Sequence, residues 1–397
     1  MRKLSVIIVS YDVKEYVAQC LLSLRRALVD IDAEIYVVDN CSGDGTAEYL
    51  RENFPEVSVI ASNHNLGFAR ANNLAIKKTE GQYVLLLNPD TIVGEHTLHD
   101  CLTFMDGHEK AGGLGVRMLR SDGTDAKESR RGLPTPLVAF YKMSGLCNHF
   151  PESRRFGKYY MGYLSWDEPA QIEVISGAFC LLRRSALEKV GLLDEDFFMY
   201  GEDIDLSYRL LKGGFENWYF PAKILHYKGE STQKTSYRYI HVFYGAMLIF
   251  LRKHYSHIGI LLSIPIKMAI FGKAFMELIK MQAEKARRSL GLDIRNRISQ
   301  PLYVFIGNTE NLQKCRTLAA SKGLDAQFEE GTKEILPDGH LGMHLPEGRQ
   351  ILAVYDSESY SFETILSLFS RNPQPNVAMG TFLPAFDMMI TTEEIMK

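Results

Sequence analysis

The sequence of 397 residues has no long apolar run, and this absence excludes one class of protein. No window reaches the ~18–20 consecutive apolar residues that a membrane-spanning helix needs. The opening MRKLSVIIVSYD has an apolar part of only Leu4 to Val9, with no small-residue cleavage site after it. It therefore predicts a first buried strand rather than a signal peptide.

Cysteine and excess basic charge are also scarce. Six cysteines are scattered without a C-x-x-C pair or a metal-ligand spacing, which excludes a disulfide framework and predicts reduced thiols in a cytoplasmic protein. The formal net charge is -3, so we expect no nucleic-acid partner. Hydrophobic residues at 46% and charged residues at 23% are ordinary for a globular protein, and the length indicates two to three domains.

Glycine-rich nucleotide fingerprints are missing as well. The first expected strand is not followed by G-x-G-x-x-G, which argues against a dinucleotide oxidoreductase. The last hundred residues contain neither that motif nor the P-loop pattern G-x-x-x-x-G-K-[ST]. No nucleotide site is therefore expected in that part of the chain.

Short aliphatic runs alternate with helical periodicity in the first ninety residues. Strands are expected at LSVIIVS, EIYVVDN, VSVIAS and YVLLLN, and helices at about 46–53 and 69–78. Strand and helix alternate four times, which predicts an α/β fold with a mainly parallel, three-layer sheet.

The later parts of the chain suggest three units. We expect a catalytic-type α/β domain at 1–235, a helical segment at 236–298 and a small α/β domain at 299–397. Within the first unit, residues 121–169 lack clear periodicity and are interpreted as a long excursion over one face. The apolar stretch 258–271, with Lys and Arg around it, is either a packed inter-domain helix or an interfacial helix at a membrane.

Polar side chains follow each of the first four expected strands. In LLLNPDT, a buried strand ends abruptly in Asn88, Pro89 and Asp90. Ligands of open α/β sheets bind beyond the carboxyl ends of the strands. The residues at those ends are Ser10, Tyr11, Asp12, Asp39, Asn40, Ser42, Asp44, Asn63, Asn65, Gly67, Arg70, Asn88 and Asp90. Each alone is explained as a turn or cap residue; as a set they predict a phosphate site that needs a divalent metal.

A second acidic cluster lies in FFMYGEDIDLSYR. Glu202, Asp203 and Asp205 come at an expected helix N-terminus, where the helix dipole favours negative charge. Capping explains part of this cluster, but a carboxylate beside Phe197 to Tyr200 can also act as a general base. His226 follows a later strand; it is either an ordinary polar residue or, beside an acidic rim, a metal ligand.

These motifs resemble those of the family 2 glycosyltransferases, which have the nucleotide-diphospho-sugar transferase (GT-A) fold, and within them a bacterial rhamnosyltransferase-like group. The matching pieces cover roughly residues 3–235 and include SVIIVSYD, EIYVVDNCSGDGT, NHNLGFARANN, YVLLLNPDT, VISGAFCLLRRSALEKVGLLDEDFFMYGEDIDLSYRL and ILHYKGEST. Several long motifs in the family's order are a far more specific signal than one glycine pattern.

The resemblance implies a role for each matching residue. Asn88-Pro89-Asp90 stands where the family has D-x-D, so Asp90 is the expected carboxylate ligand of a Mg²⁺ or Mn²⁺ ion, with His226 as the second ligand. The resemblance implies Asp203 as the catalytic base with Glu202 next to it, and Ser176, Gly177 and Ala178 on the acceptor side. The implied donor-binding residues are Ser10, Tyr11, Asp39, Asn65, Gly67, Arg70, Asn88 and Asp90.

The resemblance also implies an activity: an inverting, metal-dependent transfer of a sugar to a hydroxyl of a glycan or lipid-linked acceptor in cell-surface polysaccharide synthesis. The subgroup favours dTDP-rhamnose as donor, with UDP-sugars as the alternative. A catalytically silent nucleotide-sugar-binding protein at the membrane is the alternative of another class. The expected location is cytoplasmic, at the inner face of the membrane if the apolar helix makes peripheral contact. The C-terminal unit is expected to recruit a partner or form a homo-oligomer contact.

Overall fold

The computed structural model describes residues 2–227, 237–255, 268, 271–272, 275–283, 286–287 and 300–397. The expected boundary near residue 235 and most of the apolar stretch 258–271 lie outside these residues. Among the described helices, none is both long and apolar enough to cross a membrane.

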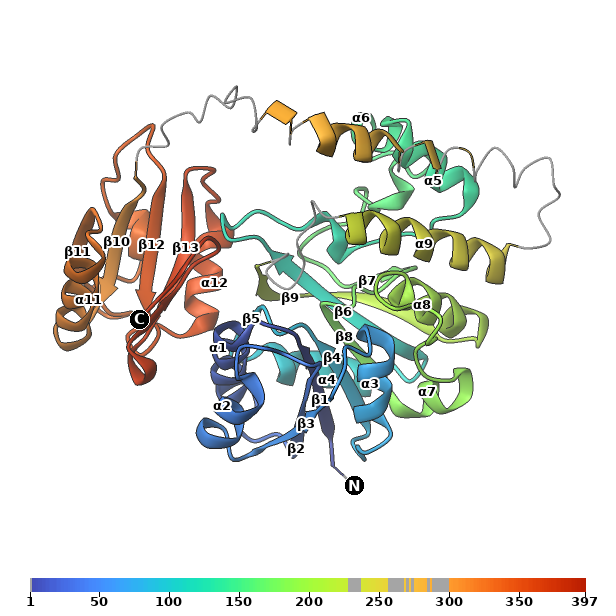
Figure 1. Ribbon diagram of the computed structural model, residues 1–397, viewed down its shortest axis with the longest axis horizontal. Coiled ribbons are helices and arrows are strands. Elements are labelled where there is room, and N and C mark those ends of the chain that lie inside the picture. Colours follow the sequence, from blue (N-terminus) through green and yellow to red (C-terminus); the bar gives the residue numbers. More distant parts are fainter. Residues whose placement is uncertain are drawn as a thin grey trace.

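A nine-stranded sheet forms the centre of the molecule (Figure 1). Its strand order is β3-β2-β1-β4-β8-β6-β9-β5, and β7 pairs with β9. The strands are β1 (Leu4–Ser10), β2 (Ala33–Asp39), β3 (Val57–Ala61), β4 (Tyr83–Leu87), β5 (Thr91–Val93), β6 (Ala111–Leu119), β7 (Ala170–Ile172), β8 (Phe179–Arg183) and β9 (Glu216–His226). The first four strands are parallel, whereas β8 runs antiparallel to β4 and β5 antiparallel to β9. The predicted α/β fold with a mainly parallel sheet is confirmed.

Alternate residues of the strands point to opposite faces of this sheet. Leu4, Val6 and Ile8 of β1 belong to one hydrophobic cluster, and Ile7 and Val9 belong to another. Helices α1 (Lys14–Ala27), α2 (Thr46–Asn53) and α4 (Thr97–Gly107) bury apolar residues in the first cluster; α3 (Phe68–Ile76), α7 (Arg184–Val190) and α8 (Glu202–Lys212) bury theirs in the second. The result is a three-layer arrangement with helices on both faces.

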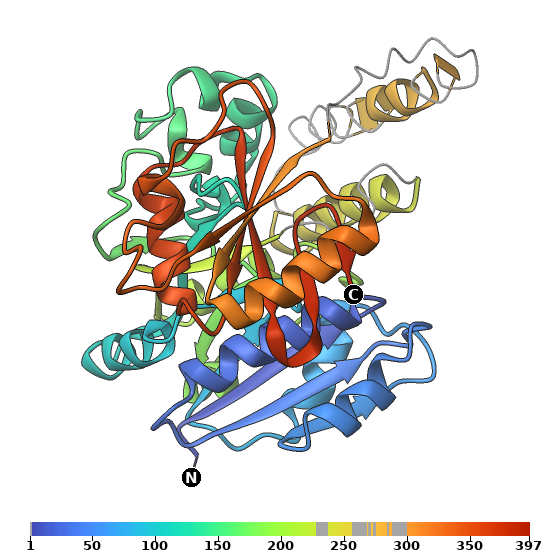
Figure 2. The ribbon, with the colours of Figure 1, turned by 90° about the vertical axis from the view of Figure 1, so that its left-hand side faces the viewer.

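The excursion between β6 and β7 contains more regular structure than its sequence suggested. It holds α5 (Pro136–Met143), α6 (Leu146–His149) and two short 3-10 turns at Lys127–Ser129 and Gly157–Tyr159. Helix α5 begins with Thr135 as its cap and Pro136 in its first turn, a common N-terminal combination. Figures 1 and 2 both place α5 and α6 at the upper end of the molecule.

After β9 and the residues outside the description, α9 (Tyr237–His254) packs against α8. Phe197, Ala246 and Phe250 form a small buried cluster, joined by Leu133 of the excursion and by half-buried residues of α8. The first part of the expected helical segment is thus packed on the main α/β unit.

A second sheet follows, with strand order β11-β10-β12-β13-β14-β15. Its strands are β10 (Leu302–Gly307), β11 (Ala326–Glu330), β12 (Ile351–Asp356), β13 (Val377–Leu383), β14 (Met388–Ile390) and β15 (Ile395–Met396). The first four are parallel and the last two antiparallel. Helix α11 (Thr309–Lys322) covers one face and α12 (Phe362–Arg371) lies on the other, where the apolar side chains join the cluster under α1 and α4.

The two sheets share this core and a set of hydrogen bonds. Tyr16 Oη donates to Thr391 O at 3.0 Å, and the backbone N–H groups of Phe362 and Glu363 donate to the Glu95 carboxylate at 2.9 and 2.7 Å. Glu95, in the turn between β5 and α4, thereby caps the N-terminus of α12. Figure 2 shows the C-terminal sheet in front of the main unit. The division at residues 235 and 298 stays a prediction.

Candidate active site

The carboxyl ends of β1 and β2 lie side by side, because Ser10 pairs with Asp39 in register. Both side chains are buried, and Ser10 Oγ and Asp39 Oδ1 have no hydrogen-bond partner among the described residues. Burial raises the pKa of the Asp39 carboxyl above its usual range, and hydrogen bonds from Ser42 partly oppose this. Two buried polar atoms aimed beyond the strand ends suit a ligand that supplies hydrogen bonds.

The loops after β2 and β3 are held together by amide side chains. Asn40 Nδ2 donates to Asn65 Oδ1 at 3.0 Å, and Asn40 Oδ1 accepts from Leu66 N at 2.7 Å. Gly67 has φ +77°, and a Cβ placed there would lie 2.4 Å from Phe198 O. Only glycine fits this close approach, which joins the β3–α3 loop to the loop before α8.

The stretch after β4 brings three predicted residues together. Asp90 is 1% exposed, and its Oδ1 lies 3.4 Å from His226 Nε2. Asn88 Nδ2 lies 3.2 Å from the same imidazole nitrogen. The pairing of Thr91 with His226 in β5 and β9 brings these residues together although they are more than 130 positions apart.

The stretch Ser176–Ala178 connects this cluster to the first turn of α8. Asn88 N donates to Ala178 O at 3.0 Å, and Gly177 N lies 3.4 Å from Asp203 Oδ2. A Cβ at Gly177 would be 3.7 Å from the Asp203 Cβ. The predicted metal ligands, acceptor-side residues and base therefore line one continuous edge of the sheet.

The three acids in the first turn of α8 have three different surroundings. Asp203 pairs with Arg131, and the two side chains are 15% and 14% exposed. Asp205 is 1% exposed and lies 2.8 Å from Arg209 Nε and 2.6 Å from His254 Nε2. Asp205 is therefore a structural carboxylate that ties α8 to α9.

Glu202 lies beside Asp203 but is buried, and its Oε2 has no hydrogen-bond partner among the described residues. Burial, followed by the negative charge of Asp203, raises the pKa of Glu202 to about 8. A carboxyl group with this pKa is mostly protonated at neutral pH and can donate a hydrogen bond. Asp203, by contrast, is paired directly with the Arg131 guanidinium.

Arg131 is the residue of this edge that the sequence did not single out. It comes from the excursion, donates to Asp203 Oδ2 and to Ile175 O, and its Nε has no hydrogen-bond partner among the described residues. Burial disfavours its charge, but the Asp203 carboxylate outweighs this and the pKa of Arg131 is raised. The pattern ESRRGLPTP placed two arginines before a proline-rich turn, yet nothing in it indicated which acid they would meet.

Two predicted residues lie at the margin of the cluster. Arg70 is 60% exposed, and its Nε lies 3.5 Å from Glu195 Oε2. Tyr11 is 37% exposed, just beyond the end of β1. Neither is fixed by the buried network, so a ligand would have to draw Arg70 away from Glu195.

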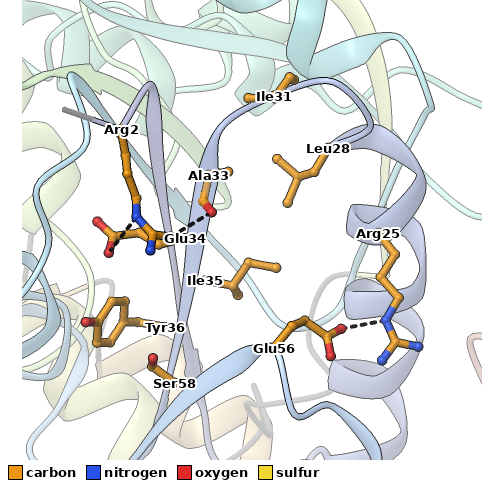
Figure 3. A pocket seen from close by; sticks show the side chains of 10 residues that line it. All are labelled: Arg2, Arg25, Leu28, Ile31, Ala33, Glu34, Ile35, Tyr36, Glu56 and Ser58. Atoms are coloured by element: carbon orange, nitrogen blue, oxygen red, sulfur yellow. Dashed lines mark hydrogen bonds and ion pairs between the residues drawn. The ribbon is translucent and has the colours of Figure 1, made fainter.

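A pocket lies at the other end of the sheet (Figure 3). It is lined by Arg2, Arg25, Leu28, Ile31, Ala33, Glu34, Ile35, Tyr36, Glu56 and Ser58. Its arginines are paired, Arg2 with Glu34 and Arg25 with Glu56. It contains none of the predicted site residues.

Asp90 and His226 fit as two ligands of a divalent cation whose remaining coordination positions would be filled by a bound molecule. Two cis ligands of an octahedral ion at ~2.1 Å lie about 3 Å apart, close to the observed 3.4 Å. A carboxylate is a usual ligand of Mg²⁺ and Mn²⁺, and an imidazole is a usual ligand of transition-metal ions. Among the described residues, no cluster of three His, Cys, Asp or Glu side chains could hold a metal alone. Further ligands would have to come from a bound molecule such as a diphosphate.

Two comparisons with known sequences both match glycosyltransferases. The sequence model of the family described as glycosyl transferase family 2 matches residues 5–191. The N-acetylglucosaminyl-diphospho-decaprenol L-rhamnosyltransferase of Mycobacterium tuberculosis is 30% identical over 267 residues, which are 64% of this chain and 85% of that protein.

Two solved structures are similar at lower identity. The crystal structure of S. aureus TarS matches with a TM-score of 0.42 and 20% identity, covering 63% of this chain and 40% of that chain. The mannosyltransferase PcManGT from Pyrobaculum calidifontis, in complex with GDP-Man and Mn²⁺, matches with a TM-score of 0.43 and 17% identity, covering 73% of this chain and 81% of that chain.

Proposed function

Because the chain belongs to glycosyltransferase family 2, we propose that it transfers a sugar, with inversion, from a nucleotide-diphospho-sugar to a hydroxyl of a lipid-linked glycan acceptor in cell-surface polysaccharide synthesis. The observation that carries this proposal is the backbone connection from Asn88 through Ala178 and Gly177 to Asp203. It supports a donor diphosphate near Asn88 and a base at Asp203 on the same edge of the sheet.

The donor base would bind beyond β1 and β2. Oδ1 of Asp39, which has no hydrogen-bond partner among the described residues, suits the N3–H of uracil or thymine, and Ser10 Oγ offers a second polar contact at the end of β1. Tyr11 is partly exposed just beyond that strand, where its ring can cover the base. Asn40 and Asn65 hold the loop that contains Gly67 next to these strand ends.

The donor diphosphate would lie at Asp90 and His226. These two side chains would hold the divalent cation, and when bound this cation offsets the negative charge that grows on the leaving diphosphate. The Asn88 amide, 3.2 Å from His226, holds the imidazole in place. Arg70, once released from Glu195, is the nearest candidate for an additional phosphate contact.

The proposed general base is Asp203. Its Oδ1 accepts from Ile204 N at 2.8 Å, and its Oδ2 accepts from Arg131 and, at 3.4 Å, from Gly177 N, which fixes the carboxylate while leaving Oδ1 a further lone pair. Asp203 removes the proton from the acceptor hydroxyl, and that oxygen attacks the anomeric carbon opposite the leaving diphosphate. The C–O bond to the acceptor forms as the C–O bond to the phosphate breaks. One displacement inverts the anomeric centre, without a carboxylate nucleophile.

Glu202 supports this step in its protonated form. With a pKa of about 8, it is mostly neutral at pH 7 and can donate a hydrogen bond to the acceptor or the transferred sugar. Its neutrality also spares Asp203 from a second negative charge next to the reacting hydroxyl.

Rhamnose from dTDP-rhamnose is the favoured donor, because the M. tuberculosis relative is named as an L-rhamnosyltransferase. A UDP-sugar is the alternative, since the Asp39 contact accepts uracil and thymine equally. The name of the same relative favours an N-acetylglucosaminyl-diphospho-lipid as the acceptor class. Such an acceptor implies action at the inner face of the cell membrane.

Product analysis tests this function. The enzyme would be incubated with Mn²⁺, a short-chain N-acetylglucosaminyl-diphospho-lipid and, in turn, dTDP-rhamnose, UDP-N-acetylglucosamine and UDP-galactose. We expect a new glycolipid with dTDP-rhamnose, with the anomeric configuration inverted by NMR. A UDP-sugar product would support the alternative donor. Nucleotide binding without turnover of any donor would contradict the proposed transfer.

A further inference from the structure

Helix α5 presents an apolar face to solvent. Leu137, Phe140 and Met143 recur at every third position and are 57%, 58% and 39% exposed, whereas Val138 and Tyr141 on the other side of the helix are buried. Phe150, just after α6, is 52% exposed. Large exposed apolar side chains that are gathered in one place mark a contact surface.

These four exposed side chains, Leu137, Phe140, Met143 and Phe150, are here called the α5–α6 face. A series of ring contacts through Tyr141 and Phe156 holds Phe150 near Phe140. The centroids of Phe140 and Tyr141 are 6.0 Å apart, those of Tyr141 and Phe156 are 5.0 Å apart, and those of Phe156 and Phe150 are 5.7 Å apart.

Positive charge lies near this face. Residues 130–160 contain six Lys or Arg and a single acid, Glu152, although the whole chain has a net charge of -3. Arg130 is buried, Arg131 pairs with Asp203 and Lys158 pairs with Glu173, so the surrounding cations are Lys142, Arg154 and Arg155. Lys142 Nζ lies 3.6 Å from the centroid of the Tyr159 ring, and Arg155 Nε donates to Tyr141 Oη at 3.1 Å. Apolar and cationic side chains interleaved on short helices are typical of segments that lie in the interface of an anionic bilayer.

The α5–α6 face is close to the proposed reaction centre. Arg131, which pairs with Asp203, precedes Leu137 by six residues. Six residues span at most roughly 20 Å even when fully extended. A bilayer in contact with α5 would therefore hold the head group of a lipid within reach of Asp203.

We propose that the α5–α6 face docks on an anionic lipid bilayer, with Leu137, Phe140, Met143 and Phe150 in the headgroup region and the surrounding Lys and Arg on lipid phosphates. This inference rests on the proposed function in one respect: docking would present a lipid-linked acceptor to Asp203. The proposed contact differs from the membrane contact predicted for residues 258–271, because its membrane-binding surface lies on the excursion that carries Arg131.

A competing surface exists on the described part of the segment after α9. Met268, Phe271, Phe275, Met276 and Ile279 are 51–68% exposed. A test of the α5–α6 face must therefore report on that face itself, and not only on binding of the whole protein.

An environment-sensitive label at Phe140 meets this need. In a Cys41→Ser chain the other cysteines are buried, so Phe140→Cys can be labelled selectively with NBD. The matched control carries the label at Val29, which is 66% exposed near the end of α1. Each protein would be mixed with vesicles of phosphatidylcholine alone or with 30% phosphatidylglycerol, a fraction of about one anionic lipid in three that suffices for polybasic attraction.

We expect the label at residue 140 to brighten and shift to the blue with anionic vesicles only, while the label at residue 29 stays unchanged. Binding of the protein without a change at residue 140 would overturn the proposal and favour the surface after α9. No binding to either vesicle would also overturn it and would favour a protein partner for this face.

Partitioning provides a second readout. Leu137→Ser with Phe140→Ser should weaken binding to anionic vesicles by about tenfold or more, since two large side chains lose their burial. Val29→Ser is the control and should bind as the wild type does. Equal partitioning of both variants would contradict the proposal. Thermal stabilisation by nucleotides, measured on the same proteins, should be unchanged, so a failed donor site is distinguishable from a failed membrane site.

Discussion

Glu202 and Asp203 are adjacent in sequence, yet their surroundings differ. Arg131 pairs with Asp203, while burial and the charge of Asp203 raise the pKa of Glu202 to about 8. A carboxyl group with a raised pKa can act as a proton donor beside a second carboxyl group that acts as a base. The resemblance implied Asp203 as the base and Glu202 as its neighbour, but the sequence could not predict the partner of Asp203, because Arg131 comes from a different part of the chain.

Replacing Asp203 by Asn should lower kcat by about 10²–10⁴-fold, because the amide cannot take the acceptor proton. Nucleotide binding should stay nearly unchanged, since Gly177 and Ala178 lie between Asp203 and the proposed donor-binding residue Asn88. Steady-state kinetics and the melting-temperature shift with nucleotide measure the two effects. An equal loss of both would contradict the base role.

Asp205→Asn is the matched control for that experiment. It removes a carboxylate from the same turn of α8, but one that pairs with Arg209 and His254. Breaking a buried pair costs about 3–5 kcal/mol of folding stability. We therefore expect a lower melting temperature, while turnover is retained at temperatures well below that melting temperature.

The pKa of Glu202 predicts a dependence of stability on pH. In the folded state the pKa of Glu202 is raised from 4.5 to about 8. Its contribution to the free energy of unfolding is therefore fully present below pH 4.5 and is lost as the pH rises to about 8. Glu202→Gln mimics the protonated form and lacks this loss. The melting temperature of the wild type should fall by several degrees relative to this variant between pH 5 and 8.

Thermal unfolding of both proteins across that pH range checks the sign. If the difference in melting temperature between the two proteins does not change with pH, or if the melting temperature of the wild type rises relative to that of the variant as the pH rises, Glu202 is ionised in the folded protein.

At the scale of elements, the sequence predicted strands and helices well where the hydrophobic period was strong. The helix at 46–53 and the strand β4 were located to within a residue, and the GT-A type of α/β fold is confirmed. Helix α5 was missed because eight residues with only two buried positions give little periodicity. The antiparallel pairing of β8 with β4, which brings Ala178 to Asn88, depends on contacts between distant segments that no local pattern encodes.

Helix α9 is expected to stabilise helix α8, which carries Asp203. Phe250 is 4% exposed in the cluster with Phe197 and Ala246. Phe250→Ala should lower the free energy of unfolding by about 3–5 kcal/mol, because it removes a buried ring and leaves a cavity. Denaturant unfolding measures this, with the exposed Arg252→Ala on the same helix as control. Equal stability of the two variants would mean that α9 does not support α8.

At the scale of the whole molecule, the C-terminal sheet is attached through residues of the main unit that lie near the proposed donor site. Tyr16 donates to Thr391 O and its ring lies 5.2 Å from that of Tyr227, which follows His226. The sequence suggested a separate accessory unit at 299–397, and that division stays a prediction. The shared core could not be predicted, since the apolar residues of α1 and α12 do not indicate which sheet each helix covers.

Removal of the cap that Glu95 places on α12 should weaken this attachment. In Glu95→Ala the N–H groups of Phe362 and Glu363 lose their acceptor, which costs about 1 kcal/mol. We expect a melting temperature lower by a few degrees. Glu52→Ala, which removes an exposed acid of α2, should leave it unchanged. Equal melting of both variants would show that the contact between the sheets contributes no stability.

The central claim is a donor site in which Asp90 and His226 bind a nucleoside diphosphate together with a divalent cation. Thermal stabilisation by UDP, dTDP and GDP, each with and without Mn²⁺, tests it most directly, since a ligand that binds the native state raises its melting temperature. We predict a Mn²⁺-dependent rise with dTDP or UDP that is lost in Asp90→Ala and His226→Ala. A shift that ignores Mn²⁺ and survives both substitutions, or no shift with any nucleotide, would contradict the account.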